Sequence, residues 1–286
     1  MIGSTAVVID SASYLPRHVR EQFGMLVVPM TVVIDGVRYA EFVDVDSVTF
    51  YERLATGAQV STSQPSPGEF LDAYERARAL GAERIVSIHI GSAYSGTVNS
   101  ARLAAELSRI PVHIIDTGQA SFIEGLCAWE ACEALALGAS SAEAEAVALR
   151  ASRAAGNVFI VRGLELMKRG GRLQLAEGEP VPGVPVLALD GDGVRPISMA
   201  SDVGDAMDAM VGYLQAALNA NPGKEFRVGI SNGAADELAA ILKARVCELP
   251  RVTEVVPYEV GPAVGVHTGP GCTGIVFLPR PVAADR

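Results

Sequence analysis

Small hydroxyl-bearing residues gather in two short segments of the first half of the chain. The run 60–66 (VSTSQPS) carries Thr62 and Ser63, and the run 92–97 (SAYSGT) carries Ser95 and Gly96. A serine or threonine hydroxyl donates one hydrogen bond and accepts others. Together with open backbone N–H groups, such hydroxyls form a good receptor for a carboxylate or a phosphate.

A third segment, near the end of the chain, adds an imidazole. His267 stands in the run 266–271 (VHTGPG), whose glycines and proline predict a tight turn. A single histidine is more often structural than functional, but this turn favours a site role, in which the ring binds an anion or moves a proton. The set is a poor metal site, because no second histidine, cysteine pair or carboxylate cluster stands at ligand spacing. We therefore expect no metal and no cofactor.

The first hydroxyl segment also has a purely structural interpretation. Ser66, with Glu69 three residues later, predicts a capping box at the start of a helix. Capping needs one hydroxyl, however, and further hydroxyls lie upstream. This surplus favours a ligand role for Thr62 or Ser63.

The run 91–97 and a basic run further on are equally open to two interpretations. Residues 91–97 predict either a capped helix start or a nest of N–H groups and hydroxyls that binds an anion. The run contains neither GxGxxG nor GxSxG, so it supports neither dinucleotide binding nor a nucleophile elbow. The run 168–172 (KRGGR) predicts a helix C-terminus, with a docking or phosphate role for Arg172 as the alternative.

Composition narrows the class of partner. The chain has 286 residues, of which 49% are hydrophobic and 20% charged, as in a folded globular protein. Its formal net charge of −10 repels nucleic acid and anionic membrane surfaces, so we expect neither as a partner.

Targeting signals and cysteine usage indicate the compartment. The first residues show no basic and apolar signal sequence, and the apolar runs are shorter than the roughly 18 residues of a membrane span. The four cysteines form no CxxC pair, which favours reduced thiols. We expect a cytoplasmic protein with no stable membrane insertion.

The order of apolar runs predicts an α/β fold in two domains. In residues 1–156, buried strands alternate with helices, which predicts βαβ units around a parallel sheet. In residues 157–286, short strands with intervening helices predict an α+β domain with a mixed or antiparallel sheet.

Within the first domain, two further features are expected. The run 26–34 predicts a strand broken at Pro29, followed by a hairpin turn at Asp35 and Gly36. Ligands bind at the C-terminal ends of parallel strands, so we expect residues 10–13, 91–97 and 116–121 to line one rim.

Taken together, these motifs resemble the DegV family of bacterial fatty-acid-binding proteins, which includes the binding subunits of fatty acid kinase. The similarity runs nearly end to end, with several specific motifs in the same order. They are DS at 10–11, VP at 28–29, TSQPS at 62–66, SGT at 95–97, IDT at 115–117, LMKRGGR at 166–172 and VHTGPG at 266–271.

The resemblance implies a non-catalytic protein of two α/β domains that buries one long-chain fatty acid in an apolar tunnel. It implies transport of this lipid or its presentation to a fatty acid kinase. Carried over motif by motif, it assigns the carboxylate to the residues Thr62, Ser63, Ser95, Gly96 and His267.

One departure from the family pattern concerns the kinase partner. An arginine that the resemblance links to acyl-phosphate handling is absent from the segment 198–202 (SMASD), around Ser201. This absence speaks against a partnership with a fatty acid kinase catalytic subunit and affects lipid binding less.

A hydrolase is the alternative from another functional class. Ser95 and His267 would then act as nucleophile and base on an acyl ester. Such a pair needs an acid to orient the histidine and an oxyanion hole, and the sequence indicates neither.

Overall fold

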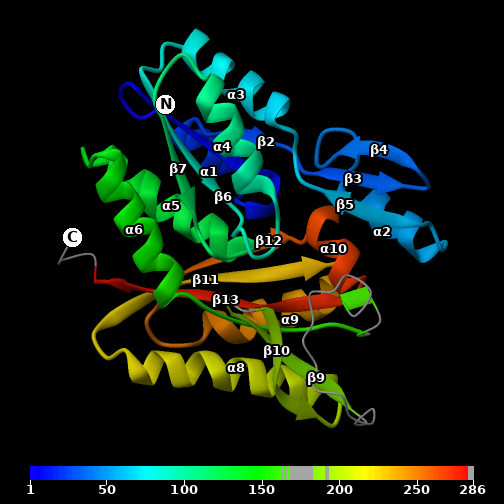
Figure 1. Cartoon of the computed structure of the whole chain (residues 1–286). Helices are drawn as coiled ribbons and strands as arrows, with labels where there is room; N and C mark the ends of the chain where they lie inside the picture. Colours follow the sequence, from blue (N-terminus) through cyan, green and yellow to red (C-terminus); the bar gives the residue numbers. More distant parts are fainter. Residues whose placement is uncertain (163, 165, 168–182, 191–192, 283–286) are drawn as a thin grey trace. The chain divides into compact units, whose positions relative to one another are not determined.

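The computed structural model describes residues 1–162, 164, 166–167, 183–190 and 193–282 (Figure 1). The chain divides into two compact units. The first contains Met1–Asp46 and Ala58–Arg153, and the second contains Ser47–Gly57 and Ala154–Arg286. The segment Ser47–Gly57 carries helix α2 (Ser47–Ala55) into the second unit.

A parallel sheet with strand order β2-β1-β6-β7 forms the centre of the first unit. Its strands are β1 (Thr5–Asp10), β2 (Leu26–Val28), β6 (Arg84–His89) and β7 (Val112–Asp116). All three strand pairs are parallel, and β1 is buried at every position, as its apolar run predicts. The predicted α/β class is confirmed.

Helices cover this sheet on its faces. Helices α3 (Pro67–Ala79) and α4 (Thr97–Leu107) pack on one face, and α5 (Phe122–Ala136) packs against β6 (Figure 1). Helix α3 buries Phe70, Tyr74 and Ala77, which recur at helical spacing. Helix α4 presents Ala101 and Ala104 to the same core, and small side chains allow close packing. The remaining helices of this part are α1 (Arg17–Phe23) and α6 (Ser141–Ala154).

The chain leaves the parallel sheet at Pro29 and forms a small antiparallel sheet with order β4-β3-β5. Its strands are β3 (Thr31–Ile34), β4 (Val37–Ala40) and β5 (Val60–Ser63). The break at Pro29 and the hairpin are confirmed, and the hairpin turns through positive φ angles of 51° at Asp35 and 81° at Gly36. Strand β5 was not expected, because its polar residues pair with β3 through the backbone alone.

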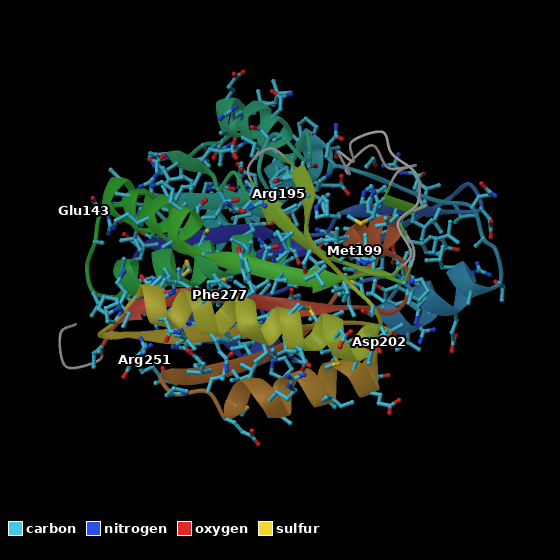
Figure 2. All side chains as sticks on the ribbon, turned by 90° about the horizontal axis from the view of Figure 1, so that it is seen from below. Glu143, Arg195, Met199, Asp202, Arg251 and Phe277 are labelled. Carbon is cyan, nitrogen blue, oxygen red and sulfur yellow. The ribbon has the colours of Figure 1, made fainter. Side chains whose placement is uncertain are left out.

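A six-stranded mixed sheet with order β10-β9-β8-β13-β11-β12 forms the second unit. Within the described residues of this sheet, the pair β11–β12 is parallel and the other four pairs are antiparallel. Helices α8 (Val203–Ala220) and α9 (Asp236–Cys247) contribute Met210, Leu214 and Leu242 to its core, where Phe277 of β13 also lies (Figure 2). The strands are β8 (Gly156–Ile160), β9 (Val184–Asp190), β10 (Gly193–Ala200), β11 (Lys224–Gly233), β12 (Val252–Glu259) and β13 (Cys272–Pro281). The predicted mixed sheet is confirmed.

The segment around His267 differs from the sequence-based expectation. Residues Pro262–Thr268 form helix α10, with proline in its first turn and His267 in its last. The predicted turn follows the helix, where Gly269 and Gly271 adopt φ angles of 69° and 88°. The basic run 168–172 lies outside the described residues.

We predict that Gly91→Ala destabilises the protein, because a Cβ at this position would lie 2.6 Å from the backbone carbon of Gly118. Such overpacking costs about 1–3 kcal/mol. Gly212→Ala is the matched control, since a Cβ at Gly212 of α8 would have no packing neighbour within 4 Å and alanine favours the helix. Thermal melting should separate the two variants, and equal melting temperatures would contradict this packing.

Two capping boxes make a second stability prediction. Ser66 Oγ accepts the Glu69 N–H at 3.3 Å while Ser66 N–H donates to the Glu69 carboxylate at 2.6 Å, and Ser140 with Glu143 repeats this pattern before α6. We expect Ser66→Ala and Ser140→Ala each to lower the free energy of unfolding by about 1 kcal/mol in urea titrations. A loss at Ser140 alone would contradict the capping role of Ser66.

Candidate ligand-binding site

The C-terminal ends of β1, β6 and β7 form the rim of the parallel sheet. Asp10, at the end of β1, accepts backbone N–H groups from Ala12 at 3.0 Å and from Ile90 at 3.1 Å. Asp116, at the end of β7, accepts the N–H of Ser92 at 3.2 Å. The loop after β6 is therefore hydrogen-bonded to the end of β1 and to the end of β7. The ends of the three strands thus form the expected common rim.

The two hydroxyl segments come together on this rim within the first unit. Thr62 and Ser63 are half-buried on β5. Next along the chain is Gln64, whose side chain contacts Gly96, because a Cβ on Gly96 would lie 3.1 Å from the Gln64 amide carbon. Ser95 Oγ lies 2.8 Å from Thr97 Oγ1 at the start of α4.

Met30 forms a second link between the segments. The Thr97 hydroxyl donates to Met30 Sδ at 3.6 Å, and the next residue, Thr31, pairs with Ser63 in the β3–β5 ladder. Gly96 stands at the N-cap position of α4 and has no side chain to cap it. Ser95 Oγ accepts the Thr97 N–H at 3.3 Å, and the other N–H groups of the first turn lie beside these hydroxyls. This arrangement of donors suits an anionic head group such as a carboxylate.

Ser66 is accounted for by the capping box described above, as the structural interpretation predicted. The surplus hydroxyls of Thr62 and Ser63 play no part in that box. They remain the candidates for a ligand role.

His267 is held firmly in the second unit. Phe50 and Tyr51 of α2 pack on Gly265 of α10, and the Tyr51 hydroxyl donates to the carbonyl oxygen of Val260 at 3.1 Å. After the helix, a Cβ on Gly271 would lie 2.6 Å from the Arg162 side chain. The half-buried ring thus projects from a well-supported helix end, and its role together with the hydroxyls is part of the proposal below.

The segment that lacks the expected arginine has a structural role. Arg195 and Met199 lie on β10, and Asp202 stands at the beginning of α8 (Figure 2). Asp202 Oδ1 accepts the N–H of Asp205 at 2.9 Å and caps this helix.

A buried polar chain, which the sequence analysis missed, crosses the first unit. His89 Nδ1 lies 3.2 Å from Asp10 Oδ2, and His89 Nε2 lies 2.6 Å from Ser87 Oγ. Ser87 in turn contacts the hydroxyl of Tyr74 at 3.0 Å, and burial raises the pKa of Tyr74 to about 12. The available signal was the pair Ser87 and His89, two polar residues at alternate positions in the apolar part of β6.

This chain of side chains has the order of a serine hydrolase triad but cannot act as one. Asp10, Ser87 and His89 are each 0% exposed, so neither water nor an ester reaches them. In the folded protein these side chains satisfy one another's hydrogen-bonding groups, which are buried away from water.

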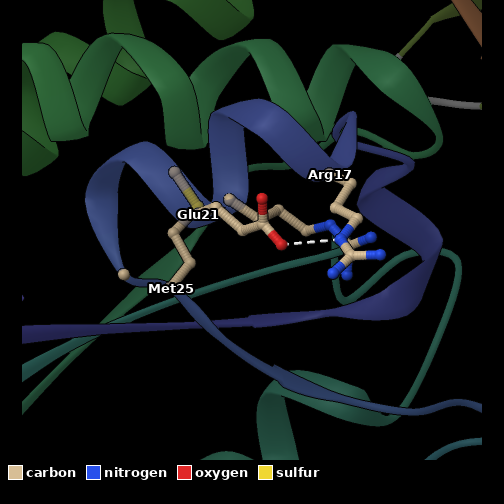
Figure 3. A pocket seen from close by; sticks show the side chains of 5 residues that line it. Arg17, Glu21 and Met25 are labelled. Carbon is tan, nitrogen blue, oxygen red and sulfur yellow. Dashed lines mark hydrogen bonds and ion pairs between the residues drawn. The ribbon is translucent and has the colours of Figure 1, made fainter.

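A separate open pocket of about 450 Å³ lies beside α1 (Figure 3). It is lined by Arg17, Arg20, Glu21, Gly24 and Met25. Arg17 Nε pairs with Glu21 at 2.6 Å, and burial, then the charge of Arg17, lower the pKa of Arg20. Because Met25 is the one large apolar side chain of this lining, the pocket does not suit a long acyl chain.

Three further properties concern metal binding, membrane insertion and the cysteines of the described residues. None of their His, Cys, Asp and Glu side chains gather in a group of three or more that could hold a metal ion. Within the same residues, no helix is long and apolar enough to cross a membrane. The four cysteines are free, and Cys127, Cys132 and Cys272 are buried.

Comparison with known proteins identifies the family. The family model described as "Uncharacterised protein, DegV family" matches residues 4–280. A DegV domain-containing protein of Streptomyces coelicolor is 31% identical over 98% of this chain and 100% of its own length.

Solved structures agree with this assignment. A DegV family protein from Thermus thermophilus, described by its fatty acid binding, is 31% identical with a TM-score of 0.89, over 96% of this chain and 99% of that one. DegV of Bacillus subtilis, described as a fatty acid binding protein, is 26% identical with a TM-score of 0.86 over the same shares. The family that the motifs resemble is confirmed, and this chain belongs to the DegV family.

Proposed function

We propose that this protein binds one long-chain fatty acid, with the carboxylate held by the hydroxyls of Thr62, Ser63 and Ser95, by the backbone at Gly96, and by His267. The observation that carries the proposal is the meeting of the two hydroxyl segments beside the start of α4, whose N-cap is a glycine. Two DegV relatives that are described as binding fatty acids, at 31% and 26% identity, support the ligand class.

Burial of the acyl chain can supply most of the binding free energy, so a head-group site with few polar groups is sufficient. A buried acyl chain gains about 0.8 kcal/mol per CH₂, on the order of 10 kcal/mol for a long chain before association costs. The polar groups then need only fix the orientation of the carboxylate. We propose that an apolar tunnel takes the chain and that these hydroxyls and His267 close its polar end.

The proposed role is transport or presentation of the lipid. Presentation to a fatty acid kinase receives less support, because the arginine that the family resemblance links to acyl-phosphate handling is absent from residues 198–202. We therefore propose lipid binding as the function and leave the kinase partner out of it.

The hydrolase alternative finds no support in the geometry of the first unit. The Ser95 hydroxyl contacts that of Thr97 at 2.8 Å, and the Asp–His–Ser chain described above is sealed from solvent. An assay with long-chain p-nitrophenyl esters should accordingly give no turnover above the rate of a Ser95→Ala variant.

We expect the purified protein to carry close to one fatty acid per chain in native mass spectrometry. After delipidation, palmitate or oleate should raise the melting temperature, because a ligand at 1,000 times its Kd adds about 4 kcal/mol of stability. An apo mass together with no thermal shift would contradict the proposal.

The head-group residues predict a specific set of variants. Ser95→Ala and Thr62→Val should each weaken oleate binding by about 1–3 kcal/mol, since each removes a hydrogen bond to a charged group. His267→Ala should also weaken binding while circular dichroism shows an intact fold. Isothermal titration calorimetry measures these affinities, with Ser66→Ala as a control that loses stability but keeps affinity. Unchanged affinity in all three variants would return these residues to structural roles.

A further inference from the structure

Three carboxyl groups lie deep inside the first unit. Asp10, Glu41 and Glu124 are between 0% and 1% exposed. A buried carboxylate is unfavourable unless hydrogen bonds or opposite charges compensate for lost water. The three groups differ in how far this compensation goes.

Asp10 and Glu41 have hydrogen-bond donors. Asp10 accepts two backbone N–H groups and faces the His89 ring, as described above. Glu41 accepts the Ser11 hydroxyl in a short hydrogen bond and the Tyr14 hydroxyl at 3.4 Å. Hydrogen-bond donors therefore offset part of the water that both groups lose on burial.

Glu124 differs from both. Neither of its oxygens accepts a hydrogen bond from a donor group of the described residues. Its carboxyl nevertheless lies beside Asp10, which acts on it both as a negative charge and as a hydrogen-bond partner. Burial first, then Asp10, then the charge of Glu41 raise the pKa of Glu124 well above its usual range.

No cation offsets this cluster among the described groups that act on Glu124. Glu124 interacts with Asp10 at the end of β1, with Glu41 after β4 and with Cys127 on α5. In turn, His89 at the end of β6 contacts Asp10, and Tyr14 after the Ser11–Ser13 turn contacts Glu41. The His89 ring has a partner at each nitrogen, Asp10 Oδ2 at Nδ1 and Ser87 Oγ at Nε2. The site thus favours an added proton over a third negative charge.

We propose that Asp10 and Glu124 share one proton, and that this proton holds the Ser11–Ser13 turn (η1) on helix α5. The turn lies directly on the helix, because a Cβ on Gly125 would stand 2.3 Å from the carbonyl oxygen of Ser13. Asp10 caps this turn by accepting the Ala12 N–H. Two unshared negative charges at this point would push the turn and the helix apart.

The turn also supports the hydroxyl site, and this part of the inference rests on the proposed function. Ser11 Oγ accepts the N–H of Met30 at 2.9 Å, and Met30 Sδ accepts the Thr97 hydroxyl. Asp10 holds the N–H of Ile90, just before the Gly91–Gly96 loop. Loss of the shared proton would therefore weaken two contacts that support the head-group residues, the Ser11–Met30 bond and the Asp10–Ile90 bond.

The sign of the pH effect follows from proton counting. Glu124 keeps its proton in the folded protein at pH values where the unfolded chain has released it. The folded state therefore binds more protons, and stability falls as pH rises from the usual glutamate range up to the raised pKa of Glu124.

Glu124→Gln tests the shared proton, because glutamine keeps a donor for Asp10 and cannot ionise. As pH rises above the usual glutamate range, one extra bound proton lowers the wild-type folding constant by up to tenfold per pH unit, and Glu124→Gln should remove this slope. Glu143→Gln is the matched control, since Glu143 is an exposed acid whose pKa is lowered by its bonds to Ser140, and it should keep the wild-type slope. Equal slopes for wild type and Glu124→Gln would overturn the proposal.

Infrared spectroscopy of the wild-type protein gives a second measurement that needs no variant to fold. At a pH above the usual glutamate range, the shared proton should give the C=O stretch of a buried carboxylic acid, and the absence of this band would overturn the shared proton. Oleate titrations then test the link to the site: wild-type affinity should fall at alkaline pH more than that of Glu124→Gln. An equal fall in affinity in both proteins would show that the shared proton does not support the lipid site. No oleate binding at any pH would reject the proposed function, and the shared proton would then be judged by the stability and infrared measurements alone.

Discussion

The carboxylate of Asp10 is the interaction on which the first unit depends most. It closes the end of β1, caps the turn that follows, holds the N–H of Ile90 at the end of β6 and orients the His89 ring. These bonds join segments that are 80 residues apart in the chain. Because Asp10 is buried, removing its carboxylate would leave several polar groups without a hydrogen-bond partner at once.

The candidate site is built on this support. The parallel sheet brings the ends of β1, β6 and β7 to one rim, and the small β4-β3-β5 sheet carries Thr62 and Ser63 to the same region of the first unit. Backbone pairing of β5 with β3 fixes the positions of these hydroxyls and leaves their side chains available. This arrangement, in which rigid strands position a few polar groups for the ligand, is common in binding proteins.

Much of this arrangement could be predicted from the sequence. Continuous apolar runs identify β1 and β6, because a parallel strand is buried on both faces, and Ser66 with Glu69 marks the start of α3. Strand β5 escaped prediction because its stability comes from backbone pairing, which polar side chains do not reveal.

The buried acids and helix α10 were missed for other reasons. Glu124 looks like a solvent-facing residue of a helix, although α5 is apolar on nearly all sides and its burial follows from that. The glycines and proline of the run 266–271 favoured a turn, and this pattern obscured the helix in which His267 stands.

A crystal structure of the protein with bound oleate is the most direct test of the claim that the hydroxyl segments bind the carboxylate. Our account predicts the carboxylate within about 3 Å of the hydroxyls of Ser95 and of Thr62 or Ser63; a carboxylate bound elsewhere, for instance at Arg17 and Arg20, would contradict it.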